Sequence, residues 1–370
     1  MIQGAASQGD PMAEQDRVHM ARALELAARG MYTTDPNPRV GCVIVREGRV
    51  IGEAWHARAG EPHAEALALR AAGPEARGST AYVTLEPCSH TGRTPPCADA
   101  LIAAGVARVL CCSVDPNPRV AGGGIERLRA AGVNVSVGLS AAPARELNVG
   151  FFSRFERARP WVRLKLAMSL DARTAPASGE TRWISGEASR ADVQRWRARS
   201  GAVLTGAGTV RADDPRLDVR LTYGSWVRQP LRVLLDPMLS CPSAAKIFHG
   251  DGALVFAAPD APAREGAATV ERLPRAAGGL DLHAVMTRLA ALEINELLVE
   301  CGPRLAGAFV AAHLVDELIL YVAPTLFGAD AAPLLEVSGL GKPGSLPAFE
   351  FKEVQHIGAD LRLILVPKKV

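Results

Sequence analysis

Three residues that can bind zinc occur in the first third of this 370-residue chain. His63 stands two positions before Glu65 at the start of a predicted helix, and Cys88 and Cys97 flank a Pro-rich loop. Histidine and cysteine are common zinc ligands, and three protein ligands leave the fourth tetrahedral position open for water. A carboxylate beside the metal can carry a proton from the attacking hydroxide to a leaving group. These residues predict a hydrolytic zinc site with His63, Cys88 and Cys97 as ligands and Glu65 as the proton shuttle.

The pattern is similar to the zinc deaminase signature His-x-Glu followed by Pro-Cys-x-x-Cys, in which hydroxide attacks an amino-bearing ring carbon. Here the eight residues SHTGRTPP, instead of two, separate the cysteines. One alternative is a closed structural zinc site with His90 as the fourth ligand, and another is that the cysteines are only buried apolar residues. His90 and Arg93 are candidates for binding a phosphate. Asn37, in the sequence PNP, is a candidate for binding a substrate ring edge or for capping a turn.

Two glycine-containing turns in the second half of the chain suggest a second site. Gly206 to Thr209 follows the apolar segment AVLT, and residues 302–307 follow ELLVE. Such turns at the carboxyl ends of strands suggest a ligand crevice of the open α/β kind. For the first turn, a tight connection without a ligand is the alternative. Arg197 and Arg220 are candidates for holding a phosphate, and ion pairing on a helix surface is the alternative for Arg197.

The elements that must position these residues form two alternating α/β series. A helix over 14–29 and two strands within 40–55 are followed by helices over 63–72, 97–104 and 124–131 that alternate with strands over 80–85, 108–114 and 133–137. This pattern predicts a three-layer α/β domain over residues 13–150. Residues 141–160 are polar, carry Pro near both ends and predict a linker with some helix.

The second series predicts an α/β domain over residues 158–370. Its expected strands lie at 161–168, 202–205, 231–235, 253–257, 296–300, 316–323 and 361–366, and its expected helices at 187–199, 207–211, 281–291 and 304–312.

Composition excludes several classes of protein. Hydrophobic residues make up 48% and charged residues 22%, which is ordinary for globular domains. The 42 basic and 39 acidic residues leave a net charge of +3 without a basic run, so neither a nucleic-acid partner nor a membrane surface is expected. There is no long apolar stretch and no signal-peptide pattern at the N-terminus. The odd number of seven cysteines favours reduced thiols and a cytoplasmic location.

Long segments of the chain resemble the bifunctional riboflavin-biosynthesis deaminase/reductase family. They include TTDPNPRVGCVIV, GEPHAEALALRAAG and AYVTLEPCSHTGRTPPC in the first half, and GAGTVRADDPRL and LLVECGPRLAGAFVAAHLVDELILYVAPTLFG in the second. The resemblance runs from about residue 16 to the C-terminus. It implies a cytidine-deaminase-like domain followed by a dihydrofolate-reductase-like domain. A nucleic-acid deaminase of the tRNA adenosine type is the alternative, against which the neutral charge and the second α/β domain argue.

The resemblance implies two consecutive reactions on small phosphorylated pyrimidines. A diaminopyrimidinone ribotide loses ammonia at the zinc site, and NADPH then reduces the ribosyl group to a ribityl chain. It also implies a homo-oligomer, a dimer or a tetramer.

In the second domain the resemblance implies roles for residues at positions that match the family. The residues implied to contact the cofactor are Ala167, Trp183, Thr209, Asp213, Gly302, Pro303, Arg304, Leu305, Ala306 and Gly307. Those implied to contact substrate are Thr181, Arg197, Leu217, Arg220 and Glu300, in addition to Asn37 in the first domain.

Four positions depart from the pattern of that family. Ala172 stands where glycine is usual, Thr181 where serine is usual, and Cys301 where alanine or glycine is usual. Pro237 stands where a hydroxyl residue often contacts the cofactor. Alanine at 172 is expected to matter only if the backbone there needs a positive φ.

Overall fold

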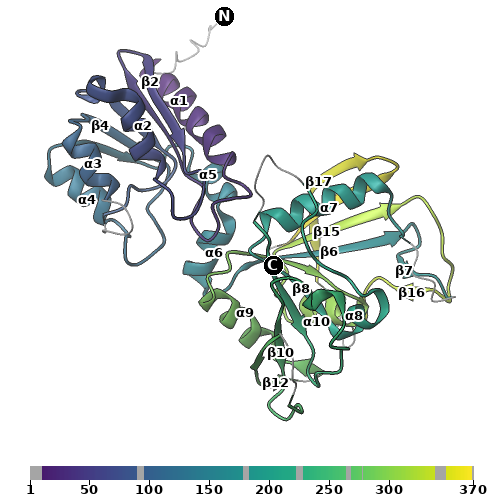
Figure 1. Ribbon diagram of the computed structural model, residues 1–370. Coiled ribbons are helices and arrows are strands. Elements are labelled where there is room, and N and C mark those ends of the chain that lie inside the picture. The colour runs from purple at the N-terminus through teal and green to yellow at the C-terminus, as the bar shows by residue number, and fades with distance from the viewer. Residues whose placement is uncertain are drawn as a thin grey trace, which may run out of the picture. The chain divides into compact units, whose positions relative to one another are not determined.

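The chain forms two compact units, Met1–Arg157 and Ala158–Val370. The computed structural model describes residues 11–89, 96–177, 183–221, 228–263, 268–276, 278–337 and 347–368 (Figure 1). None of the helices within these ranges is long and apolar enough to cross a membrane.

The first unit is built on a five-stranded sheet with the order β2-β1-β3-β4-β5. β1 is antiparallel to β2 and β3, whereas β3, β4 and β5 run parallel. The strands are β1 (Gly41–Arg46), β2 (Arg49–Trp55), β3 (Thr80–Val83), β4 (Arg108–Cys111) and β5 (Asn134–Val137). The helices are α1 (Pro11–Ala28), α2 (Ala64–Ala72), η1 (Gly73–Ala76), α3 (Cys97–Ala103), α4 (Gly123–Ala130), α5 (Ala141–Leu147) and α6 (Val149–Arg157).

Side chains of the first sheet alternate between two cores, as strand geometry requires. Cys42 and Ile44 of β1 pack in the core that also holds residues of α2, α3 and α4. Val43 and Val45 pack in the opposite core with α1 and α5. The three-layer α/β architecture predicted for the first domain is therefore confirmed.

The segment predicted as a linker with some helix contains two helices and packs on the first unit. α5 and α6 cover most of residues 141–157, and Phe151 and Phe152 of α6 are buried beside Leu85. Asn148, between the two helices, accepts from the backbone N–H of Arg39 over 2.8 Å. The helical part of the prediction is confirmed, but the segment belongs to the first unit, because its apolar side chains are buried there.

The second unit is built on a nine-stranded sheet with the order β11-β10-β9-β8-β14-β6-β15-β18-β17. The strands from β11 to β15 run parallel, while β18 and β17 form an antiparallel pair at the edge. These strands are β6 (Trp161–Ser169), β8 (Ala202–Gly206), β9 (Leu231–Leu235), β10 (Leu254–Ala257), β11 (Thr269–Arg272), β14 (Glu296–Glu300), β15 (Glu317–Ala323), β17 (Phe349–Ile357) and β18 (Asp360–Pro367).

Helices cover both faces of this sheet. α9 (Leu282–Ala291) and α10 (Pro303–Ala311) pack on one face, and α7 (Glu187–Arg199) and α8 (Ala207–Asp213) on the other. Smaller elements are η2 (Lys246–Phe248) and the short pairs β7 (Arg173–Ala175) with β16 (Ala332–Pro333) and β12 (Arg275–Ala276) with β13 (Gly279–Leu280). The α/β class predicted for the second domain is confirmed.

The sequence did not predict β17 or β11. Almost every residue of β17 is exposed, so the strand lacks the apolar alternation that reveals a half-buried strand. It is held by pairing with β18, which is an interaction between segments that a local pattern cannot show.

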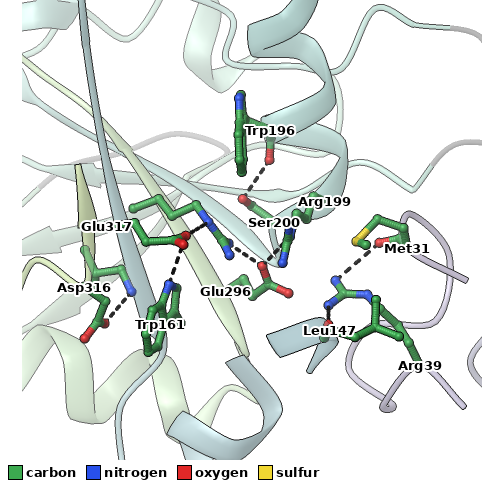
Figure 2. Close-up of polar contacts among 12 residues, drawn as sticks. Met31, Arg39, Leu147, Trp161, Trp196, Arg199, Ser200, Glu296, Asp316 and Glu317 are labelled. Carbon is green, nitrogen blue, oxygen red and sulfur yellow. Dashed lines mark hydrogen bonds and ion pairs between the residues drawn. The ribbon is translucent and has the colours of Figure 1, made fainter. Parts of the chain in front are cut away.

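A buried ionic network joins the amino-terminal ends of β6, β14 and β15 on the α7 face. Arg163 is 1% exposed and donates to Glu296 and, over 2.5 Å, to Glu317. Figure 2 shows Trp161 donating to Glu317 and Arg199 of α7 donating to Glu296 over 2.8 Å. The network fixes α7 against the central strands, because a slipped register would leave a buried charge without its partner.

We expect Arg163→Met to lower the free energy of unfolding of the second unit by about 3 kcal/mol, because two buried carboxylates lose a shared cation. Unfolding in guanidinium, followed by tryptophan fluorescence, measures this change, since four of the five tryptophans lie in residues 158–370. The control is Arg275→Met, which breaks the exposed pair with Asp260 and should change stability much less. Equal effects of the two substitutions would contradict the structural role of the network.

Candidate active sites

The three predicted zinc ligands meet in the first unit. The ligand atoms of His63, Cys88 and Cys97 all lie within 4.8 Å of one another. His63 Nδ1 is 3.6 Å from Cys88 Sγ and 3.3 Å from Cys97 Sγ. Bond lengths of 2.0–2.3 Å in a tetrahedral site place ligand atoms about 3.5 Å apart, so the cluster fits zinc. His90, the ligand of the closed-site alternative, and Arg93 lie outside the described residues.

The ligands come from the starts of two helices and from one loop. His63 is the residue before α2, and Cys97 is the first residue of α3. Cys88 follows β3, and its sulfur accepts from the backbone N–H of Cys97 over 3.3 Å. The positive end of a helix favours a thiolate, so this arrangement suits a metal site with anionic sulfur ligands.

The charges of the cluster are strongly coupled. Hydrogen bonds from Cys97 and His63 lower the pKa of Cys88, although burial opposes this shift. The hydrogen bond with Cys88 raises the pKa of His63. Glu65 is 3% exposed, and burial raises its pKa. A buried carboxyl group beside the ligands can therefore both hold and release a proton.

Glu86 holds the loop that carries Cys88, a role that no local sequence pattern indicates. Its carboxylate is buried and accepts from the backbone N–H groups of four residues, at distances of 2.9 to 3.2 Å, namely Asp115, Gly122, Gly124 and Ile125. The start of α4 thus lies directly against the Cys88 loop. A Cβ atom at Gly124 would lie 1.8 Å from the carbonyl oxygen of Pro87, so only glycine fits there.

Asn37 lies beside a histidine that the sequence analysis did not single out. Its Nδ2 atom is 3.1 Å from Nε2 of His56, and Nδ1 of His56 is 3.2 Å from the carbonyl oxygen of Pro62. The ring of His56 meets the ring of His63 edge-on at 5.3 Å. Burial lowers the pKa of His56, which favours the neutral ring. The side chain of Asn37 thus contacts a histidine that packs against the metal ligand His63.

The two predicted glycine turns of the second unit lie side by side. β8 and β14 are parallel neighbours, so the turns at their carboxyl ends meet. The backbone N–H of Gly302 donates to Thr209 Oγ1 over 3.1 Å, and a Cβ at Gly206 would lie 3.0 Å from Leu305. Two helix starts and close glycine backbone at one sheet edge can hold the phosphates of a nucleotide.

A buried ionic cluster lies next to these turns. Arg197 of α7 donates to Glu300 through Nε, over 2.6 Å, and through Nη2, over 3.1 Å. Lys165 Nζ of β6 is 3.8 Å from the same carboxylate, and burial lowers the pKa of Lys165. Burial would raise the pKa of Glu300, but Arg197 and Lys165 offset it and the pKa is lowered. The cation of Arg197 is thus already paired with Glu300, and Lys165 lies beside the same carboxylate.

The segment with Leu217 and Arg220 is fixed by side chains from other elements. Gln194 accepts from the backbone N–H of Arg220 over 2.9 Å, and the amide of Gln229 pairs with both backbone groups of Val219. Leu217 is buried with φ +56, which is unusual for a leucine. Arg220 Nε lies 3.8 Å from Asp218, but 58% of the Arg220 side chain is exposed, so its charge is more accessible than that of Arg197.

The remaining predicted residues of the second site differ in how exposed they are to a ligand. Trp183 is 75% exposed, Asp213 and Arg304 are exposed, and Ala167 and Pro303 are partly buried. Ala306 faces the core and donates its backbone N–H to Gly302, and a Cβ at Gly307 would lie 2.0 Å from the Glu336 carbonyl oxygen. Ala306 and Gly307 therefore support the fold of the turn. Thr181 lies outside the described residues.

Comparisons with known proteins agree with this pair of sites. Residues 13–113 match the family model described as the cytidine and deoxycytidylate deaminase zinc-binding region, and residues 160–363 match the model of the RibD C-terminal domain. The riboflavin biosynthesis protein RibD of Escherichia coli is 51% identical over 364 residues, which cover 95% of this chain and 99% of that protein. The chain belongs to the RibD family.

Solved structures of this family share the whole architecture. Acinetobacter baumannii RibD matches with a TM-score of 0.90 and 44% identity, covering 96% of this chain and 100% of that one. A Thermotoga maritima structure, titled as a diaminohydroxyphosphoribosylaminopyrimidine deaminase/5-amino-6-(5-phosphoribosylamino)uracil reductase, matches with a TM-score of 0.84 and 31% identity over the same shares. The resemblance inferred from the sequence is therefore confirmed.

The departures from the RibD pattern have different structural consequences. Ala172 has φ +55, so the position that usually holds glycine does need the left-handed region. Cys301 packs against the core of the second unit, where its small side chain is accommodated. Pro237 uses its carbonyl oxygen to accept from Ala258 over 3.0 Å, which leaves the turn after β9 intact.

We expect Ala172→Gly to stabilise the second unit by about 0.5–1 kcal/mol, because a Cβ is disfavoured at positive φ by more than the added flexibility of the unfolded chain. Guanidinium unfolding measures the change. The control is Ala308→Gly on the exposed side of α10, where glycine should lower stability by about 1 kcal/mol. A loss of stability in both variants would show that Ala172 is unstrained.

Proposed function

We propose that the chain catalyses two consecutive steps of riboflavin biosynthesis at two separate sites. The first unit would deaminate 2,5-diamino-6-ribosylamino-4(3H)-pyrimidinone 5′-phosphate to the uracil and release ammonia. The second would use NADPH to reduce the ribosyl group of 5-amino-6-(5-phosphoribosylamino)uracil to ribityl. The observation that carries the proposal is the His63, Cys88 and Cys97 cluster with buried Glu65, in a chain that also matches the RibD C-terminal domain.

In the first step His63, Cys88 and Cys97 would hold zinc, which lowers the pKa of a coordinated water and so supplies a nucleophile at neutral pH. Glu65 would accept the proton of the attacking water on its carboxylate and deliver it to the leaving amine. Its burial supports this role, because burial raises the pKa of the carboxyl group and makes its carboxylate a stronger base for taking up the proton. Asn37 would bind the pyrimidine edge, and Glu86 would keep the Cys88 loop in place.

We expect Glu65→Gln to retain zinc and to lower the rate of ammonia release by at least about a hundredfold, because glutamine cannot carry the proton. Zinc content and ammonia from the diaminopyrimidinone ribotide are the measurements. Glu61→Gln, at an exposed position near the same helix, is the matched control and should stay active. The same Glu65→Gln protein should still oxidise NADPH when it is given the uracil ribotide. Retained deamination would overturn the role of Glu65.

In the second step the turns at 206–209 and 302–305 would bind the cofactor, with Ala167, Trp183 and Asp213 as further contacts. NADPH supplies the hydride, so the chain needs no side-chain nucleophile. Glu300 would contact the sugar of the substrate from a position fixed by Arg197 and Lys165. Leu217 would line the substrate site, and the role of Thr181 in binding substrate stays a prediction. If NADH served equally well in this reaction, the assignment of NADPH would be wrong.

Arg220 is the candidate for binding the substrate phosphate, because its charge is accessible and its backbone is held by Gln194. We expect Arg220→Met to raise the KM of the uracil ribotide about tenfold, because a charge-assisted contact with a dianion is lost. Arg216→Met, at an exposed position on the same segment, is the control and should leave KM unchanged. An unchanged KM for Arg220→Met would place the phosphate elsewhere.

The cellular location, oligomeric state and partners of the enzyme are also part of the proposal. None of the seven cysteines forms a disulfide bond, which suits a reducing compartment such as the cytoplasm. The homo-oligomeric state stays a prediction, and so does the absence of a nucleic-acid partner.

A further inference from the structure

One tryptophan of the second unit has an exposed ring that is nevertheless held in place. Trp183 is 75% exposed, whereas the other tryptophans that the structure describes, Trp55, Trp161 and Trp196, are partly buried. The guanidinium carbon of Arg190 lies over the Trp183 ring, 5.2 Å from its centre. A cation at this distance is attracted to the face of an indole. Arg190 therefore covers one face of the ring and leaves the other open to a ligand.

The guanidinium of Arg190 is itself fixed by the backbone. Its Nη1 atom donates to the carbonyl oxygen of Ser185 over 2.7 Å, and its backbone N–H donates to the carbonyl oxygen of Gly186 over 3.1 Å. No carboxylate of the described residues pairs with Arg190, so the indole and the Ser185 carbonyl are the partners of its cation. The guanidinium thus keeps one orientation against the ring.

The start of α7 is fastened to the sheet by a buried carboxylate. Asp360 of β18 is 2% exposed and accepts from the backbone N–H of Gly186 over 2.8 Å and from the hydroxyl of Ser189 over 2.6 Å. A carboxylate that binds the first N–H groups of a helix stabilises the helix start. Trp183 lies three residues before Gly186, so the backbone near the indole has a fixed anchor on the sheet.

Arg190 lies on the face of α7 that reaches the proposed substrate site. Positions 190, 194 and 197 are spaced by four and three residues, which places them on one side of a helix. Gln194 accepts from the backbone N–H of Arg220 over 2.9 Å, and Arg197 donates to Glu300 over 2.6 Å. Arg190 is about 10 Å along the helix axis from Arg197. The indole that Arg190 holds therefore lies on the same side of α7 as the residues proposed to contact substrate.

We propose that Arg190 is a positioning residue that holds the indole of Trp183 in one orientation, so that the open face of the indole stacks on the nicotinamide ring of NADPH. The ring that donates the hydride must lie next to the substrate, and the shared face of α7 favours the nicotinamide over the adenine for this contact. An indole that is ordered before the cofactor arrives lowers the entropy cost of binding. The inference rests on the proposed reductase function and adds Arg190 to it.

Equilibrium titration of NADPH into the full-length chain, followed by the fluorescence of the bound cofactor, tests the proposal without turnover. Arg190→Met should raise the Kd of NADPH about fivefold, because the indole must then be ordered on binding. Arg195→Met, on the other side of α7 where 63% of the arginine side chain is exposed, is the control and should leave the Kd unchanged. A rise confined to the KM of the uracil ribotide would place the substrate ring on Trp183 and overturn the proposal.

Trp183→Ala decides whether Arg190 acts through the indole. This substitution should raise the Kd of NADPH at least about tenfold, because the stacking surface is lost. In the Trp183→Ala background, Arg190→Met should cause no further rise, because the ring that it orients is gone. An equal rise with and without Trp183 would show that Arg190 contacts the cofactor directly, which is incompatible with the proposal.

The order of the indole can also be measured without cofactor. The near-UV circular dichroism of Trp183, obtained as the difference from Trp183→Phe, should fall in Arg190→Met and persist in Arg195→Met, since only a ring in a fixed environment gives such a signal. An unchanged Trp183 signal in Arg190→Met would refute the positioning role. If the unsubstituted chain binds no NADPH, the proposed reductase function fails, and this signal still decides whether Arg190 orders the ring.

Discussion

A charge buried inside a protein needs an opposite charge or hydrogen-bond donors around it, and this constraint fixes the loops of both candidate sites. In the first unit the buried carboxylate of Glu86 gathers four backbone N–H groups and so holds the loop that ends in Cys88. In the second unit Arg163 forms ion pairs with Glu296 and Glu317 at the amino-terminal ends of the central strands. Arg197 forms an ion pair with Glu300 within the candidate site. Each site therefore lies on backbone that a buried ionic group keeps in register.

In both units the candidate catalytic and binding residues lie at the ends of strands and helices, for the same physical reason. Side chains and N–H groups are available there, since the regular hydrogen bonds of the strand or helix stop. His63 and Cys97 lie where α2 and α3 begin, and Gly206 and Glu300 lie where β8 and β14 end. The middle parts of the strands and helices can then carry the apolar side chains of the core. Ala172 and Leu217 have positive φ in connecting segments, whereas no residue of β6, β8 or β14 does.

Local patterns predicted the elements that bury apolar residues and failed for the exposed ones. Helix α1 and strands β1, β6 and β14 lie close to their predicted ranges, because each carries apolar residues in a run or at the period of the element. The exposed edge strand β17 has no such period, and its pairing with β18 is not a local property. The charged outer sides of α5 and α6 resembled a linker, although Phe151 and Phe152 are buried on the inner side.

The sequence by itself determined the candidate chemistry, since the types and order of His63, Glu65, Cys88 and Cys97 suffice to predict a hydrolytic zinc site. It also determined the family, because similarity over both halves does not require coordinates. The tertiary structure decided which side chains hold these residues. Glu86, His56 and Lys165 reach the sites only through folding, and Arg197 is paired with Glu300 from an element 103 residues away. Such partners are distant in sequence, and only packing brings them within hydrogen-bonding distance.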